Sequence, residues 1–152
     1  MEPGGGVGIR ARLRACDFPP GTADLQQRLL ELLPVAGVLL VVTPQDVAHL
    51  DARRLLHMLA EKGTRVLGAV ENMAGLRCSH CGETTDVFPT VAPERSIWAH
   101  SVERLAALPL DPDLPRQGEA GRPAMLSAPD SEVATRIREL ATTLARTVAG
   151  DP

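Results

Sequence analysis

Apolar positions along the chain form two continuous runs separated by a helical stripe. The runs are GVLLVVTP (37–44) and RVLGAVEN (65–72), and such runs of leucine and β-branched residues are typical of strands buried on both faces of a parallel sheet. Between them, the pattern of residues 45–63 predicts a helix, which Lys62 in the last turn and Gly63 beyond it would end. Its predicted inner half carries Val47, Leu50, Leu55, Met58 and Leu59.

Weaker patterns extend this series at both ends. Arginines alternating with small or apolar residues over 10–16 predict a strand with one exposed face. A short helix near 93–101 and a strand near 104–109 are also expected, and a last helix should follow Asp130 as its cap. A further helix, at 23–33, places four leucines on one side, namely Leu25, Leu29, Leu32 and Leu33.

The order of strands and helices predicts an α/β fold, with a parallel sheet covered by helices on both faces. In such sheets, ligands bind beyond the carboxyl ends of the strands. Asp17, residues 43–46, Asn72 and the cysteines that follow all come after predicted strands. We therefore expect them to lie along one edge of the sheet.

Length and charge narrow the classes of protein. The 152 residues are one domain by length, and a net charge of −3 gives no electrostatic footprint for nucleic acid. The most apolar run, residues 35–42, is too short to span a membrane, and no secretory signal is visible at the start. These features predict a cytoplasmic protein whose thiols stay reduced, where a C-x-x-C motif indicates metal or redox chemistry.

Two of the three cysteines, Cys78 and Cys81, form such a motif in a stretch that reads as a loop, ENMAGLRCSHCGETTD (71–86). Two thiols make half of a four-thiolate zinc or iron–sulfur site, and a twofold dimer would supply the other half. The alternatives are a zinc knuckle completed by His80 or another local group, and a dithiol with no metal. Cys16 is expected to be a small buried residue rather than a ligand.

Four segments, taken together and in order, resemble the C-terminal half of the Mrp/ApbC family of iron–sulfur cluster carrier ATPases. They are DFPPGTAD, VVTPQDVAHLDARR, LGAVENMAGLRCSHCGETTDVF and LPLDPDLPRQGEAGRP. The resemblance runs from Asp17 to Pro123 and implies a P-loop fold of the MinD and ParA group. It divides the chain into a flexible start with a candidate edge strand at 1–16, and the C-terminal part of a nucleotide-binding domain at 17–150.

The resemblance also implies roles for individual residues. Asp17 matches the acidic residue that serves the magnesium-bound or attacking water, and Asn72 matches the asparagine that reads the adenine edge. Pro20, Gly21 and Thr22 match the loop that senses the γ-phosphate. Cys78 and Cys81 match the pair that binds a [4Fe–4S] cluster across a homodimer and passes it to apo-proteins, with zinc able to replace iron. In full-length relatives, ATP and magnesium would regulate that transfer.

The nucleotide site itself is incomplete in this sequence. No G-x-x-x-x-G-K-[ST] motif occurs, and the only lysine, Lys62, ends a helix. We therefore expect that the chain alone does not hydrolyse ATP, and Asp17 and Asn72 are equally well read as a turn aspartate and a strand end. Two other functions remain open: a zinc- or thiol-bearing interaction module, and a degenerate fragment with exposed strand edges.

Overall fold

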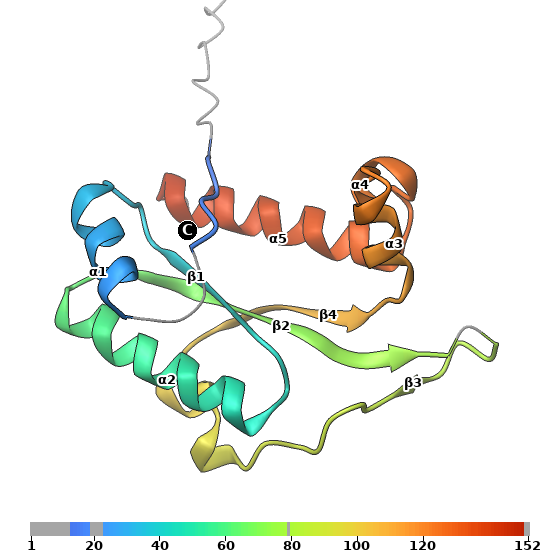
Figure 1. Cartoon of the computed structure of the whole chain (residues 1–152), viewed down its shortest axis with the longest axis horizontal. Helices are drawn as coiled ribbons and strands as arrows, with labels where there is room; N and C mark the ends of the chain where they lie inside the picture. Colours follow the sequence, from blue (N-terminus) through green and yellow to red (C-terminus); the bar gives the residue numbers. More distant parts are fainter. Residues whose placement is uncertain (1–12, 19–22, 79, 151–152) are drawn as a thin grey trace, which may run out of the picture.

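The computed structural model describes residues 13–18, 23–78 and 80–150 (Figure 1). Its helices are α1 (Ala23–Leu32), α2 (Asp46–Glu61), α3 (Asp113–Glu119), α4 (Ala124–Ser127) and α5 (Glu132–Ala149), with 3₁₀ helices η1 (Pro93–Arg95) and η2 (Ile97–His100). The strands are β1 (Val38–Val42), β2 (Val66–Arg77), β3 (Thr84–Thr85) and β4 (Arg104–Leu110).

Strand β2 is the centre of a four-stranded mixed sheet. It pairs in parallel with β1, from Val38 opposite Val66 onward, and in parallel with β4 on its other side. The two-residue strand β3 pairs antiparallel with the end of β2. The predicted α/β class and the parallel order of the three longer strands are therefore confirmed, and β3 is an addition that the sequence pattern did not indicate.

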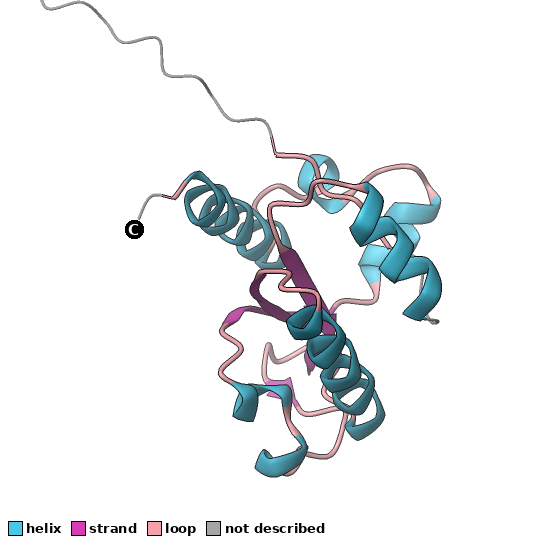
Figure 2. Ribbon diagram, turned by 90° about the vertical axis from the view of Figure 1, so that its left-hand side faces the viewer, coloured by secondary structure: helices cyan, strands magenta, loops and turns pink. Residues whose placement is uncertain are grey.

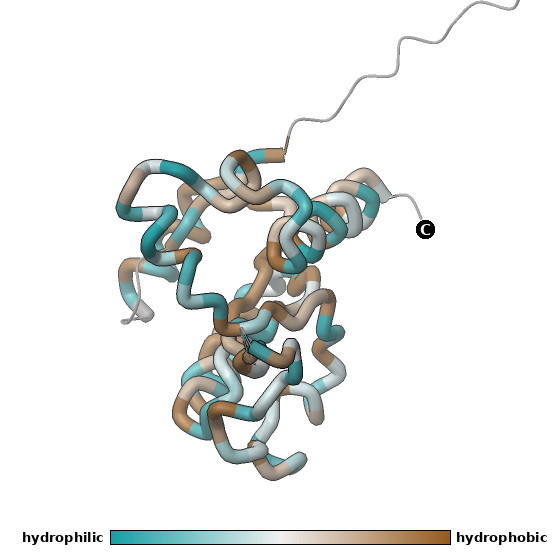
Figure 3. The backbone as a smooth tube through the Cα atoms, turned by 90° about the vertical axis from the view of Figure 1, so that its right-hand side faces the viewer, coloured by the Kyte–Doolittle hydropathy of each residue, from teal (hydrophilic) through white to brown (hydrophobic). Residues whose placement is uncertain are grey.

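Helices cover both faces of this sheet. Helix α2 packs on β1 and α5 packs on β4, and the two helices lie on opposite sides of the strands (Figures 1 and 2). The core between α2 and the sheet contains Leu40, Val42, Ala52, Ala69 and Ile97. Figure 3 shows hydrophobic and hydrophilic positions mixed along α5, as expected of a helix with one face on a strand and the other in water.

The buried face of α2 differs from the predicted one. Val47 is 67% exposed and Leu50 is also exposed, whereas His49 is only 1% exposed. His49 can be buried because its Nδ1 accepts a hydrogen bond from the backbone N–H of Ile97 at 3.2 Å. A hydropathy pattern counts histidine as polar, so it rotates the predicted inner face away from this residue. Met58 and Leu59 are buried as predicted.

The leucine side of α1 is also exposed, with Leu32 at 77%. The predicted helix is present, and of its four leucines Leu29 alone is half-buried. An ion pair between Glu31 and Lys62, 2.6 Å long, joins α1 to the end of α2. The outer edge of β1 has no strand partner among the described residues, and Val41 on this strand is exposed.

The remaining differences concern the ends of elements. Residues 13–16, the described part of the strand predicted at 10–16, are not a strand, and residues 10–12 lie outside the described part. Ser131 rather than Asp130 caps α5, since its Oγ accepts from the N–H of Ala134 at 3.2 Å. The helix predicted near 93–101 is the pair of 3₁₀ helices, and β4 confirms the strand predicted near 104–109. None of the described helices is long and apolar enough to cross a membrane.

Candidate metal-binding site

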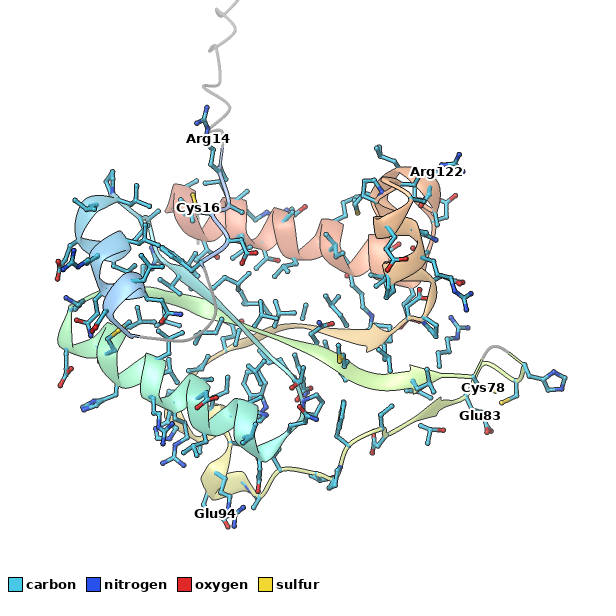
Figure 4. All side chains as sticks on the ribbon, viewed as in Figure 1. Arg14, Cys16, Cys78, Glu83, Glu94 and Arg122 are labelled. Atoms are coloured by element: carbon cyan, nitrogen blue, oxygen red, sulfur yellow. The ribbon has the colours of Figure 1, made fainter. Side chains whose placement is uncertain are left out.

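The C-x-x-C motif forms the turn of a β-hairpin rather than a free loop. Strand β2 runs past Asn72 to Arg77, and the chain returns as β3. The N–H of Cys78 donates to the Glu83 carbonyl at 2.7 Å, and the N–H of Gly82 donates to the Cys78 carbonyl at 2.9 Å. Figure 4 shows Cys78 and Glu83 at the far end of this hairpin, projecting from the body of the molecule.

An irregularity in β2 precedes the hairpin. Asn72 lies opposite Leu108 of β4 and Leu76 lies opposite Leu110, so three residues of β2 face a single residue of β4. Within this bulge, Met73 has a φ of 59°, and its N–H donates to the side-chain oxygen of Asn72 at 3.0 Å. Because bulges bend a strand and increase its local twist, this one sets the direction in which the hairpin leaves the sheet.

The two thiols occupy different environments. The backbone N–H groups of Cys81 and His80, together with the Cys81 thiol, hydrogen-bond to the Cys78 sulfur and lower the pKa of Cys78 below its ordinary value. Cys81 is exposed, and its sulfur lies 3.9 Å from a Glu83 carboxylate oxygen. The turn therefore favours a thiolate at Cys78, which is the form that binds metal.

Charged residues outside the motif attach the hairpin to the rest of the molecule. Arg77, directly before Cys78, pairs with Glu132 at the start of α5 at 3.3 Å. Glu132 also pairs with Arg136 at 2.7 Å, and Arg136 donates to the backbone carbonyl of Ala107 in β4. This chain of contacts was not predicted from the sequence. Arg77 stands directly before the cysteines in the stretch RCSHCGE, so the sequence offered a signal for a charged contact at this position.

The structure brings Cys78 and Cys81 together but leaves the third cysteine elsewhere. Cys16 and Cys78 lie towards opposite ends of the long axis of the molecule in Figure 4. Cys16 is exposed, so its expected burial was wrong. Residues 13–18 form no strand, and residues 13–17 around Cys16 are exposed.

The predicted nucleotide residues are not joined by a hydrogen bond or ion pair in the described part of the chain. Asp17 is exposed, next to Cys16 in the sequence, and the side-chain oxygen of Asn72 accepts from Met73. Pro20, Gly21 and Thr22 lie outside the described residues. Asn72 lies inside β2 and engages its own neighbour, so it does not end a strand. The roles of these residues stay predictions.

The hairpin provides two thiols, which suit a thiophilic metal but are only half of a four-ligand site. Among residues 13–18, 23–78 and 80–150, no three His, Cys, Asp or Glu side chains are grouped so as to hold a metal ion. The hairpin thus offers two thiols, while tetrahedral zinc and [4Fe–4S] clusters take four protein ligands. His80 does not complete a described set with the two cysteines.

Several relatives align with most of this chain, but the aligned part is less than half of each relative. An iron–sulfur cluster carrier protein of Pseudomonas fragi is 42% identical over 130 residues, which is 86% of this chain and 45% of the relative. The carrier of Escherichia coli strain K12 is 38% identical, over 82% of this chain and 34% of the relative. The iron–sulfur cluster transfer protein NUBPL of Dictyostelium discoideum is 31% identical, over 82% of this chain and 39% of the relative. The chain therefore spans less than half the length of these relatives.

Solved structures place the fold among MinD-type ATPases. The cell division ATPase MinD of Pyrococcus furiosus superposes with a TM-score of 0.63 at 26% identity, over 84% of this chain and 49% of that one. MinD of Pyrococcus horikoshii, solved with Mg-ADP, superposes with a TM-score of 0.65 at 22% identity, over 88% of this chain and 50% of that one. The second comparison supports the fold alone.

The family itself is settled by a match along almost the whole described chain. The model of the ParA family described as NUBPL iron-transfer P-loop NTPase matches residues 15–145. This range includes every element from α1 to β4, the cysteine hairpin, and most of α5. The protein belongs to the NUBPL iron-transfer P-loop NTPase family of the ParA group.

Proposed function

We propose that this protein is an iron–sulfur cluster carrier that binds its cargo through Cys78 and Cys81. The observation that carries the proposal is the position of both cysteines in the turn of a projecting hairpin. Amide hydrogen bonds to the Cys78 sulfur favour the thiolate there. The relatives named as iron–sulfur cluster carriers support the same cargo.

In this proposal, two copies of the chain bind one cluster. Each hairpin contributes two thiolates, and a twofold axis between the tips completes the four ligands of a [4Fe–4S] cluster. The recipient is an apo iron–sulfur protein. Each transfer step exchanges one cysteine of the carrier for one of the recipient: the recipient thiol loses its proton and binds iron, and the released cysteine takes up a proton. Iron and sulfide keep their oxidation states throughout.

We further propose that residues 17–150 correspond to the C-terminal part of the longer relatives. There, ATP and magnesium would regulate the transfer. The sequence printed here contains no phosphate-loop motif, and its one lysine, Lys62, pairs with Glu31. A triphosphate therefore lacks the backbone cradle and the lysine charge that normally bind it, and this chain alone does not hydrolyse ATP.

A transfer assay tests the proposed function. The chain is loaded anaerobically with iron and sulfide and mixed with an apo-ferredoxin in the presence of an iron chelator. We expect the ferredoxin to gain its cluster absorbance, because an intact cluster passes directly between thiolates. Cys78→Ser and Cys81→Ser should each abolish transfer. Cys16→Ser, which removes an exposed cysteine distant from the hairpin, should leave it unchanged.

The alternative is a zinc-bearing interaction module, and the same hairpin observation favours it as the second candidate, since thiolates also bind zinc. The two functions differ in what the loaded protein does. A chain that retains zinc against iron and gives no transfer to ferredoxin is an interaction module. Transfer that survives in Cys78→Ser, or that is lost in Cys16→Ser, contradicts the assignment of the hairpin.

A further inference from the structure

A separate cavity lies behind the hairpin, at the bulge of β2. It has a volume of about 310 Å³, is open to solvent on one side, and is lined by α2, β2, the chain that returns from β3, η2 and the start of β4. Its lining includes His49, Glu71, Met73, Phe88, Trp98 and Arg104. None of these residues belongs to the C-x-x-C motif.

His49 contributes a hydrogen-bond donor to the lining of the cavity. Its Nδ1 accepts from the backbone N–H of Ile97, so Nδ1 is unprotonated and the neutral ring carries its proton on Nε2. The side chain is 1% exposed, and no residue in the described part of the chain accepts from Nε2. No fully buried side-chain nitrogen or oxygen of the described residues lacks a partner, so Nε2 keeps some accessible surface. Since His49 lines the cavity, this surface opens into it, and a ligand there can accept from Nε2.

Other residues of the lining offer acceptors and a negative charge. Arg104 donates to one carboxylate oxygen of Glu71 at 2.8 Å, while its guanidinium lies 5.7 Å from the centre of the Trp98 ring. The second oxygen of Glu71 has no partner among the described residues. Asp86 adds another carboxylate to the lining. Because two carboxylates and one guanidinium line the cavity, an anionic ligand would be repelled, whereas a ligand with N–H groups could donate to the carboxylate oxygens.

Apolar and aromatic groups form the rest of the walls. Met73 and Phe88 line the cavity, and Trp98 meets His49 edge to face with ring centres 5.9 Å apart. A small pocket with apolar walls and a few placed polar groups is the usual form of a small-molecule site. Planar ligands suit such walls because they can lie against aromatic rings.

We propose that this cavity binds a small neutral planar molecule whose edge presents a hydrogen-bond acceptor beside an N–H donor, as a carboxamide or a nucleobase does. The acceptor receives the Nε2–H of His49, and the donor binds the free oxygen of Glu71. The site lies against residues 86–91, which lead back from the hairpin, so a ligand there contacts the segment that holds the cysteine turn. The proposal does not depend on cluster binding.

Trp98 makes a direct test available, because it is the only tryptophan and the chain has no tyrosine. Benzamide and benzoate are titrated against the intact chain while Trp98 fluorescence is followed. They match in size, but benzoate is an anion without an N–H donor. We expect a saturable response to benzamide and about tenfold weaker binding of benzoate, the difference of one hydrogen bond together with the charge. Adenine, the nucleobase probe, should compete with benzamide.

Variants separate the cavity from the rest of the surface. His49→Phe should weaken benzamide binding about tenfold or more. His57→Phe is the matched control, since His57 lies exposed on the same helix and outside this cavity, and it should change nothing. Ala74→Leu, which narrows the cavity from β2 and retains both polar partners, should also abolish binding and replaces His49→Phe if that variant does not fold. Equal binding of benzoate and benzamide, no saturable response to benzamide, or equal losses in His49→Phe and His57→Phe would overturn the proposal.

Discussion

The backbone N–H of Cys78 donates to the carbonyl of Glu83 at 2.7 Å, and this bond closes the turn that contains both cysteines. It joins the end of β2 to the residue directly before β3. Since β2 is held on both sides by β1 and β4, the position of the thiols is tied to the centre of the sheet. Changes in the hairpin should therefore alter metal chemistry without unfolding the protein.

Gly82 permits this turn because its φ is 76°, which a residue with a Cβ adopts at a cost of about 1–2 kcal/mol. Gly82→Ala should open the turn, remove the amide hydrogen bonds from the Cys78 sulfur and return the pKa of Cys78 toward its ordinary value. Alkylation of Cys78 by iodoacetamide, resolved by mass spectrometry across pH, measures this shift. Gly118→Ala, at a position with no atoms near the added Cβ, should leave the profile unchanged. An unaltered profile in Gly82→Ala would contradict the proposed role of the turn.

Gly75 allows β3 to approach β2 closely. A Cβ on Gly75 would lie 2.7 Å from the methyl group of Thr84, closer than real atoms approach. Gly75→Ala should loosen the β2–β3 pair and speed amide hydrogen exchange at Leu76 and Arg77. Thr84→Ser removes that methyl group, so the double variant should recover part of the protection, with a coupling of about 0.5–3 kcal/mol. If Thr84→Ser gives no recovery, the close contact is not the cause.

His49 makes stability depend on pH. Burial is the largest cause that lowers the pKa of His49 from its ordinary value of 6.5, and the carboxylates of Glu71 and Asp46 oppose it. The unfolded chain then binds a proton at pH values where the folded chain does not. Its contribution to stability is complete above about pH 6.5 and decreases as the pH falls toward the lower pKa of the folded protein.

We therefore expect the urea midpoint to fall between about pH 7 and about pH 5.5. His49→Gln should flatten this slope, because its amide oxygen can still accept from Ile97 but does not titrate. His57→Gln, at an exposed position on the same helix, should keep the slope. Equal slopes in the wild type and in His49→Gln would rule out this histidine as the source.

Ile97 is a core residue on a 3₁₀ helix and is fully buried. Ile97→Ala removes methyl groups that pack against the cluster of Leu40, Val42 and Ala69, and should cost about 2–5 kcal/mol in the free energy of unfolding. Leu126, which is 80% exposed, provides the control, and Leu126→Ala should change stability by about 0.5 kcal/mol or less. Urea unfolding measures both, and similar costs would contradict the assigned core.

The sequence predicted the elements that depend on local pattern. The strands β1 and β4, and the helix α2 with its stop at Gly63, follow from apolar runs and end signals that need no tertiary information. Helix α3 was missed because Pro115 and Gly118 lie inside it and both residues disfavour helices. The far half of β2 was missed because its polar and small residues become a strand only through pairing with β3 and β4.

The candidate sites also differ in how far the sequence predicts them. Cys78 and Cys81 were identified because the spacing of a C-x-x-C motif places both thiols in one turn. The cavity at His49 could not be predicted, because it depends on η2 bringing the Ile97 amide to a histidine 48 residues earlier in the chain. The leucines of α1 were predicted to share one side of the helix, and helical spacing does not show whether anything packs on that side.

Two hairpins binding one cluster would give a fixed ratio of iron to protein, and one measurement tests this directly. The chain is reconstituted anaerobically with iron and sulfide, and iron, sulfide and molecular mass are determined on the same sample, beside the Cys78→Ser/Cys81→Ser double variant. We predict about four irons and four sulfides per dimer, all lost in the double variant, which should remain a monomer. Zinc alone, a metal-free monomer, or iron retained by the double variant would contradict the account.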